Sequence, residues 1–197
     1  MFKPSIEQLK NAMKKRAYPL KTGEYELNII GIRNENAKPN FFDDTICVLF
    51  KDEYLDDTLL TFSCTTDPGL FWLEHPITVE GCAIMKEGNY KDVYKIGLHK
   101  GYKALVQIGN IHYVRDNNKD GVLDFDKGKD FFGVFATNIH HAAMPENSVI
   151  VEKWSAGCQV INKGWNEFIE LCDKSKLITG RNLFSYTLIN LKDVKNA

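Results

Sequence analysis

Short apolar runs separated by turns extend along most of this 197-residue chain, and they constrain its fold more than any other feature. The first three runs cover residues 25–33, 45–50 and 58–64. Alternating apolar and polar residues over about four to eight positions are typical of β-strands that are buried on one face. Asp56 and Asp57 stand between the second and third runs, so we expect these two strands to form a hairpin.

The pattern continues through the second half of the chain. We expect further strands at 81–85, 92–99, 104–114, 130–140, 149–154, 160–161 and 184–191. The segment 65–69, Thr-Thr-Asp-Pro-Gly, predicts a turn because proline fixes φ and glycine accepts a positive φ. The aromatic residues of the next segment, 70–79, leave two interpretations open: the wall of a substrate groove, or packing against the core.

Two segments have helical spacing instead. Ser5 and Gln8 form a capping box, which predicts a helix that continues to about Arg16. Asn162 is placed to cap a second helix, in which apolar side chains recur every three or four positions over 165–172.

Composition limits both the fold class and the partners. The chain is long enough to bury one hydrophobic core, and 44% of its residues are apolar. We therefore predict a mainly β (α+β) protein, with an N-terminal helix within residues 1–20 and a single domain over 21–197. The formal net charge is −1, so no basic field is available to bind nucleic acid. No apolar run approaches the length of a membrane span.

The five cysteines predict neither a disulfide framework nor a zinc ribbon. They are Cys47, Cys64, Cys82, Cys158 and Cys172, an odd number without a Cys-x-x-Cys pair. Four of them lie in apolar runs, where a cysteine is most simply a small buried hydrophobic residue. Cys158 differs because Gly157 precedes it, and a glycine lets backbone N–H groups approach a substrate closely.

A histidine upstream provides a candidate base for Cys158. Cysteine is a useful nucleophile only as the thiolate, and histidine is the usual base that generates it. His140 ends an apolar run, and Ser155 follows it by fifteen positions. Adjacent residues of a strand point to opposite faces, so only one of His140 and His141 can face Cys158.

The order His140, Ser155, Gly157, Cys158 resembles the signature of the L,D-transpeptidase catalytic domain, the YkuD-like cysteine enzymes of peptidoglycan. That signature is a histidine and, after a gap of this length, Ser/Thr-His-Gly-Cys with arginine or asparagine two residues on. This chain has Ala156 in place of the signature's second histidine, and Gln-Val follows its cysteine.

The resemblance covers roughly residues 80–190, and Gly88–Tyr90 with Tyr94–Gly97 is similar to a Gly-x-Tyr strand of that family. It implies a β-sandwich or barrel fold. It also implies a cysteine enzyme that acts on L,D bonds of peptidoglycan stem peptides through a Cys158 acyl-enzyme. In that chemistry His140 is the general base and acid, and no cofactor is required.

Further residues around this pair have expected roles. Ser155 would orient His140, unless a backbone carbonyl does so, and N–H groups near Gly157 and Cys158 would stabilise the oxyanion. The candidate substrate-binding residues are His99, Tyr90, Trp154 and Gln159. A catalytic Cys158 with a depressed pKa would react with iodoacetamide faster than a free thiol.

Either water or an amine can resolve the acyl-enzyme. We favour hydrolysis, as in a lysin-like L,D-carboxypeptidase or endopeptidase, because the N-terminus has no apolar secretory segment and a wall-building enzyme is normally exported. The protein is then expected to be made in the cytoplasm and to reach the bacterial wall after lysis, injection or delivery on a phage particle. The alternatives are an L,D-transpeptidase proper, a non-catalytic virion or wall-binding module on the same fold, and a cysteine peptidase that acts on proteins.

An acidic stretch before the histidine resembles the first part of a calcium loop. Its oxygen-bearing residues at positions one, three, five and nine are Asp116, Asn118, Asp120 and Asp124. Gly121 occupies position six, but Lys127 stands where the bidentate glutamate is expected. A structural calcium ion is one interpretation of this stretch. The other is a hairpin tip whose Asp and Asn side chains cap their own backbone.

Overall fold

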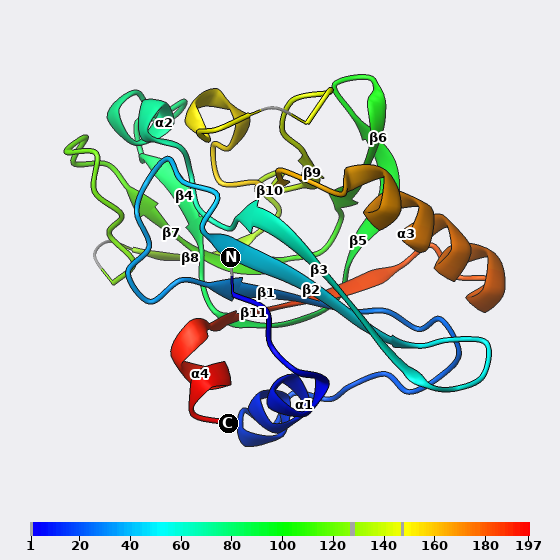
Figure 1. Ribbon diagram of the computed structural model, residues 1–197. Coiled ribbons are helices and arrows are strands. Elements are labelled where there is room, and N and C mark those ends of the chain that lie inside the picture. Colours follow the sequence, from blue (N-terminus) through cyan, green and yellow to red (C-terminus); the bar gives the residue numbers. More distant parts are fainter. Residues whose placement is uncertain (1, 127–128, 147) are drawn as a thin grey trace.

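Eight strands close into a barrel, which begins with three strands from the first third of the chain (Figure 1). The computed structural model describes residues 2–126, 129–146 and 148–197. Strands β1 (Asn28–Arg33), β2 (Asp44–Lys51) and β3 (Asp57–Thr65) pair antiparallel in sequence order. The hairpin predicted between the second and third apolar runs is therefore confirmed.

The remaining barrel strands come from the second half of the chain. They are β5 (Gly88–His99), β6 (Tyr102–Gln107), β9 (Ile139–His141), β10 (Gln159–Ile161) and β11 (Phe184–Asn190). The order around the barrel is β1-β11-β5-β6-β9-β10-β3-β2. Two of its neighbouring pairs, β1 with β11 and β9 with β10, are parallel. The second parallel pair places two distant segments, 139–141 and 159–161, side by side.

A small antiparallel sheet stands beside the barrel and contains β4 (Cys82–Met85), β7 (Ile111–Asp116) and β8 (Asp130–Gly133). Two segments that were each predicted as one strand are split between this sheet and the barrel. Segment 104–114 forms β6 and β7 in different sheets, because the chain bends at Ile108 and Gly109, whose N–H groups both donate to the Val93 carbonyl. Segment 130–140 is likewise split into β8 and β9, with irregular backbone between them.

The helices agree with the sequence in part. Helix α1 (Ile6–Lys15) has the expected capping box at Ser5, and α3 (Trp165–Thr179) follows β10. The second cap is Gly164 at φ 83°, not the predicted Asn162. Two short helices were not predicted, α2 (Leu70–Glu74) and α4 (Leu191–Lys195). No helix in the described part of the chain is long and apolar enough to cross a membrane.

The predicted strand at 149–154 is wrong, because this segment ends in a 3-10 helix over Glu152–Trp154. Its backbone finds partners elsewhere. The Val151 N–H donates to the Asn40 carbonyl, and the Glu152 N–H donates to the Asn40 side chain. A loop thus takes the hydrogen bonds that a neighbouring strand would have supplied.

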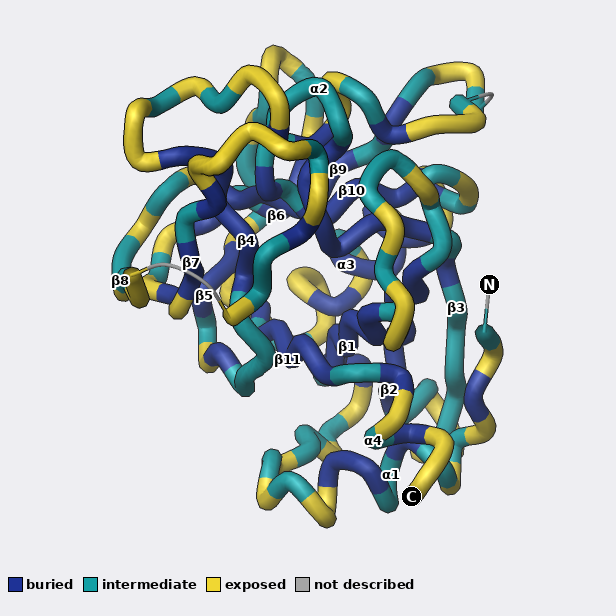
Figure 2. Tube along the Cα trace, turned by 90° about the vertical axis from the view of Figure 1, so that its left-hand side faces the viewer, coloured by how far each residue is buried: buried dark blue, intermediate teal, exposed yellow. Residues whose placement is uncertain are grey.

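Strand β1 is buried along its whole length (Figure 2), and two hydrophobic clusters explain why. One fills the barrel and includes Ile29 and Ile46 with Phe168 of α3. The other lies outside the barrel, where Ile30 of β1 packs with Leu9 of α1 and residues of α4. Strand β1 is consequently buried on both faces. The prediction of a mainly β (α+β) protein with an N-terminal helix and a helix after Cys158 is confirmed.

Candidate active site

Cys158 immediately precedes β10, and its side chain lies on the face that points away from the barrel interior. Ile139 of β9 and Ile161 of β10 belong to the interior cluster. Because side chains alternate along a strand, His140 and Cys158 lie on the opposite face. The parallel pairing sets Gln159 beside Ile139, so Cys158 and His140 come from adjacent strands and share one face.

The turn that presents Cys158 is held by its own side chains. The Ser155 hydroxyl donates to the Cys158 carbonyl at 2.7 Å and accepts from the Gly157 N–H at 3.2 Å. Thr137 donates through its hydroxyl to the Gly157 carbonyl. Gly157 has φ 119°, and a Cβ there would lie 2.6 Å from the Ala83 carbonyl oxygen. The serine therefore closes the turn instead of orienting the histidine, and the glycine is required by the backbone.

A buried ion pair supports the other side of this turn. The Gly69 N–H donates to the Ser155 carbonyl at 2.9 Å. Asp67, two residues earlier in the predicted 65–69 turn, forms a 2.9 Å ion pair with Arg33. Both charged side chains are almost completely buried. The 65–69 turn predicted from Pro and Gly thus supports the Cys158 turn through the hydrogen bond from Gly69 to Ser155.

The Cys158 sulfur lies between two backbone groups. Its Sγ is 3.5 Å from the Asn138 N–H, which donates to it, and 3.7 Å from the Ala136 carbonyl, to which the thiol donates. Burial raises the pKa of the thiol, and the Asn138 N–H and Lys100 offset this only in part. The thiol is therefore the resting form. The expected depressed pKa of Cys158 is not what this environment produces.

His140 is 2% exposed and has one free ring nitrogen. Its Nδ1 is 2.7 Å from the His141 carbonyl and 3.2 Å from the Tyr102 hydroxyl. A carbonyl only accepts, so Nδ1 carries the proton and Nε2 keeps the lone pair. Nε2 is buried without a hydrogen-bond partner in the described structure. A backbone carbonyl, the alternative considered for Ser155, thus orients this ring with its basic nitrogen free.

Burial also keeps the histidine neutral. It lowers the pKa of His140 to about 3, more than the hydrogen bond to the His141 carbonyl raises it. His99 stacks on His140, with ring centroids 4.3 Å apart and planes 15° apart. Burial lowers the pKa of His99 as well, with a smaller contribution from Lys100. The imidazole of His140 and the thiol of Cys158, which come from adjacent strands, are therefore both neutral in this structure.

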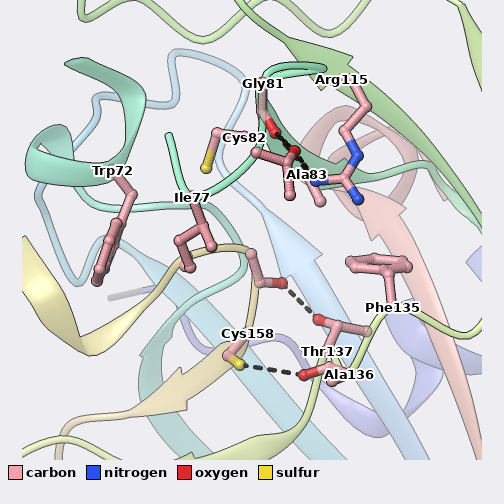
Figure 3. Close-up of a pocket in the computed structure, with 13 residues that line it drawn as sticks. Trp72, Ile77, Gly81, Cys82, Ala83, Arg115, Phe135, Ala136, Thr137 and Cys158 are labelled. Carbon is pink, nitrogen blue, oxygen red and sulfur yellow. Dashed lines mark hydrogen bonds between the residues drawn. The ribbon is translucent and has the colours of Figure 1, made fainter. Parts of the chain in front are cut away.

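A cavity of about 240 Å³ opens in front of Cys158 (Figure 3). Trp72 and Ile77 form one side of it, and Phe135 stands across from them. The Arg115 guanidinium lies at the end opposite the cysteine. Trp72 of segment 70–79 lines this cavity, whereas its neighbour Phe71 stacks on His75 at 5.0 Å and does not.

The other predicted substrate-binding residues take different positions. His99 contacts the Asn138 side chain at 3.0 Å and stacks on His140, but it does not line the cavity. Gln159 is fully buried on the interior face, where it accepts from the Tyr186 hydroxyl at 2.8 Å. Because it alternates with Cys158 on the strand, it cannot contact the same substrate.

Tyr90 and Trp154 also lie outside the Cys158 cavity. Tyr90 belongs to the core, and its hydroxyl donates to the Lys86 carbonyl at 2.7 Å. Burial raises its pKa to about 12. Trp154 is 39% exposed at the end of the 3-10 helix and does not line the cavity.

Sequence reasoning missed four residues of the site. They are Tyr102, Arg115, Thr137 and Asn138. The last two precede the predicted histidine by a few positions, and this proximity was the only available signal. The other two come from β6 and β7, which no motif connects with the cysteine. Pairing of the strands brings them to the site.

The acidic stretch forms a turn whose polar groups bind one another. The Asn118 amide donates to Asp120 and Asp124, each at 2.9 Å, and Asp116 accepts from the Asp124 N–H at 3.1 Å. Within the described part of the chain, no three His, Cys, Asp or Glu side chains are grouped to hold a metal ion. Lys127, at the twelfth loop position, lies outside the described residues. This hydrogen bonding is typical of the hairpin-tip interpretation.

Comparisons with known proteins add no identification. No protein-family model, curated protein or solved structure matches this chain.

Proposed function

We propose that this protein is a cysteine-dependent enzyme that cleaves L,D peptide bonds in peptidoglycan stem peptides. One observation carries the proposal. Cys158 stands at a cavity, and the neighbouring strand presents His140 with its basic Nε2 buried and unpartnered. Cys158 is also the only one of the five cysteines that is not buried. The substrate class comes from the resemblance of the His140–Cys158 motif.

The first step transfers the thiol proton to His140 Nε2. In the resting structure Sγ contacts the Ala136 carbonyl, so the proposal requires the side chain to turn toward the imidazole when substrate binds. Catalytic hydrogen bonds are often long or misaligned before substrate binding. The thiolate then attacks the carbonyl carbon of the L-configured residue and forms a tetrahedral intermediate.

Stabilisation of the oxyanion falls to the Cys158 N–H. The Gly157 N–H, which the motif suggested as a second donor, is already bonded to the Ser155 hydroxyl. The Cys158 N–H has no acceptor among the residues that the structure describes. A preorganised backbone donor of this kind stabilises developing negative charge without further rearrangement.

Collapse of the intermediate breaks the C–N bond, and the His140 imidazolium gives its proton to the leaving amine. A thioester then joins the acyl residue to Cys158. Water, deprotonated by neutral His140, attacks this thioester and releases a carboxylic acid and the thiol. This hydrolytic route follows from our preference for a lysin-like enzyme. An amine in place of water would give transpeptidation.

The test is incubation with disaccharide-tetrapeptide and disaccharide-pentapeptide muropeptides, followed by mass spectrometry. Wild-type protein is expected to release D-amino acid from the stem, and Cys158→Ala to release none. Cys82→Ala is the matched control, because Cys82 lines the same cavity but is buried and its pKa is raised to about 12 by burial. That variant should retain activity.

The product masses decide between the candidate reactions. A truncated stem shows hydrolysis, and a crosslinked product shows transpeptidation. Turnover that persists in Cys158→Ala, or absence of turnover on every muropeptide by the wild-type protein, would contradict the proposed function.

A further inference from the structure

The cavity in front of Cys158 ends at a cation. Arg115 belongs to β7, in the small sheet beside the barrel, and its side chain points into the cavity from the end opposite the cysteine (Figure 3). The intervening walls are mainly apolar and include Ile77 and Phe135. A substrate that reaches Cys158 through this cavity therefore passes a guanidinium group in surroundings of low polarity.

Uncharged groups hold the guanidinium in place. Its Nη1 donates to the Gly81 carbonyl at 2.9 Å and lies 3.5 Å from the Thr78 hydroxyl. The group also lies over the Tyr113 ring, 5.2 Å from its centroid. All of these partners are uncharged. They fix the direction of the side chain, and none of them neutralises its positive charge.

Arg33, by contrast, has the carboxylate partner that Arg115 lacks among the described residues. Arg33 is buried and pairs with Asp67 at 2.9 Å. No carboxylate in the described part of the chain lies within ion-pair distance of Arg115. The positive charge of Arg115 has only a small effect on exposed Glu80. Hydrogen bonds from the Glu80 backbone N–H and from Thr78 lower the pKa of Glu80 more than Arg115 does.

We propose that Arg115 binds a carboxylate of the substrate, and thereby sets its specificity. An arginine presents several N–H donors in a planar fork that matches a carboxylate. This inference rests on the proposed function, because it places the reacting peptide between Arg115 and Cys158. It restricts the substrate class to peptides that carry a carboxylate close to the scissile bond.

Two carboxylates of a stem peptide satisfy this requirement. One is the C-terminal α-carboxylate of the D-residue that leaves, and its recognition would make the enzyme a carboxypeptidase. The other is on the side chain of a diaminopimelate third residue. A lysine third residue lacks the second group, and a C-terminal amide lacks the first, so four synthetic tetrapeptides separate the two sources.

The experiment measures kcat/KM for wild-type protein, Arg115→Met and Arg115→Lys on these four peptides. We expect Arg115→Met to lower kcat/KM by about 10- to 100-fold, mostly through KM, on peptides that carry the recognised carboxylate. For the wild-type protein, kcat/KM should be lower by about the same 10- to 100-fold on peptides that lack this carboxylate than on peptides that carry it. Arg115→Lys should fall between the two, because it keeps the charge and loses the fork.

Lys100→Met is the matched control, because Lys100 is a second cation near the site that does not line the cavity. Its effect should be the same on all four peptides. An equal loss on all four peptides in Arg115→Met, or no loss on any, overturns the proposal for Arg115.

A binding measurement separates failure of this inference from failure of the proposed function. Cys158→Ala protein is titrated calorimetrically with the same four tetrapeptides, with and without Arg115→Met. If the wild-type protein cleaves none of the peptides, the proposed function fails. Tighter binding of one carboxylate form that is lost with Arg115→Met would still support carboxylate recognition, and absence of binding to every peptide would overturn it.

Discussion

The two segments that sequence motifs single out have opposite hydrogen-bonding character. In the acidic turn after β7, the polar groups bind one another: Asn118 donates to two aspartates, and Asp116 accepts from the backbone of Asp124. Around Cys158 the opposite holds. His140 Nε2 is buried without a partner, and the Arg115 charge has no counter-ion in the described structure.

This difference separates a turn whose polar groups are paired with one another from a site where, in the proposed function, the substrate supplies the missing partner. Buried polar groups are nearly always paired, so an unpaired one costs free energy that other parts of the fold must offset. The acidic turn incurs no such cost. The Cys158 site incurs it at His140, and a substrate or a proton from the thiol would remove it. The two segments therefore give opposite expectations for mutation and for added ligand.

The largest effect is expected from the unpaired nitrogen. His140→Gln removes the proposed base on the strand next to Cys158 and should lower kcat on the cleaved tetrapeptide by about 10²- to 10⁴-fold. His141→Gln is the control, because its ring packs on Tyr102 and its backbone carbonyl, which orients His140, is unchanged. Chromatographic assay of the released amino acid gives both rates. Similar losses in the two variants would remove His140 from the mechanism.

Next in size is the effect of the glycine before the nucleophile. Gly157→Ala forces φ 119° on an alanine and places its Cβ 2.6 Å from the Ala83 carbonyl oxygen. The free energy of unfolding should fall by about 1–3 kcal/mol from the backbone strain alone. Gly133→Ala is the control, since a Cβ at that position meets no atom within 4 Å. Urea denaturation compares them, and equal stability of the two variants would show that the turn adapts.

A smaller effect concerns the rate of alkylation. Burial raises the pKa of Cys158, and only the thiolate reacts, so iodoacetamide should modify the protein more slowly at neutral pH than it modifies a free thiol. The rate should rise as pH increases through the raised pKa. With the pKa of His140 lowered to about 3, no second step is expected near pH 6.5.

Mass spectrometry of the modified peptide follows this reaction, with Cys158→Ala as the blank. Fast alkylation at pH 5 to 7 would instead indicate a preformed thiolate–imidazolium pair. It would contradict the neutral resting state that we derive from burial.

The smallest effect is expected from calcium. Because the side chains of the acidic turn already bind one another, millimolar calcium should change Tm by less than about 1 °C. A rise of several degrees in the wild-type protein that is absent in Asp120→Asn would restore the calcium interpretation, and with it a structural role for the loop.

Features of the fold that depend on residues close in sequence could be predicted, and features that depend on distant residues could not. The helix at Ser5 and the hairpin of β2 and β3 were predicted correctly, because capping and alternation act over a few residues. The break between β6 and β7 was missed, because the apolar pattern continues across it. That break exists because the Val93 carbonyl accepts from Ile108 and Gly109, a contact that no local pattern encodes.

The candidate site divides in the same way. By itself the sequence determined which residues are candidates for chemistry: a cysteine after a glycine, and a histidine at the end of an apolar run. Tertiary structure decided their surroundings. It buried Gln159 inside the barrel, placed Arg115 at the far end of the cavity, and raised the pKa of Cys158 through burial. Side-chain identity is local, whereas burial, charge pairing and strand neighbours depend on the whole chain.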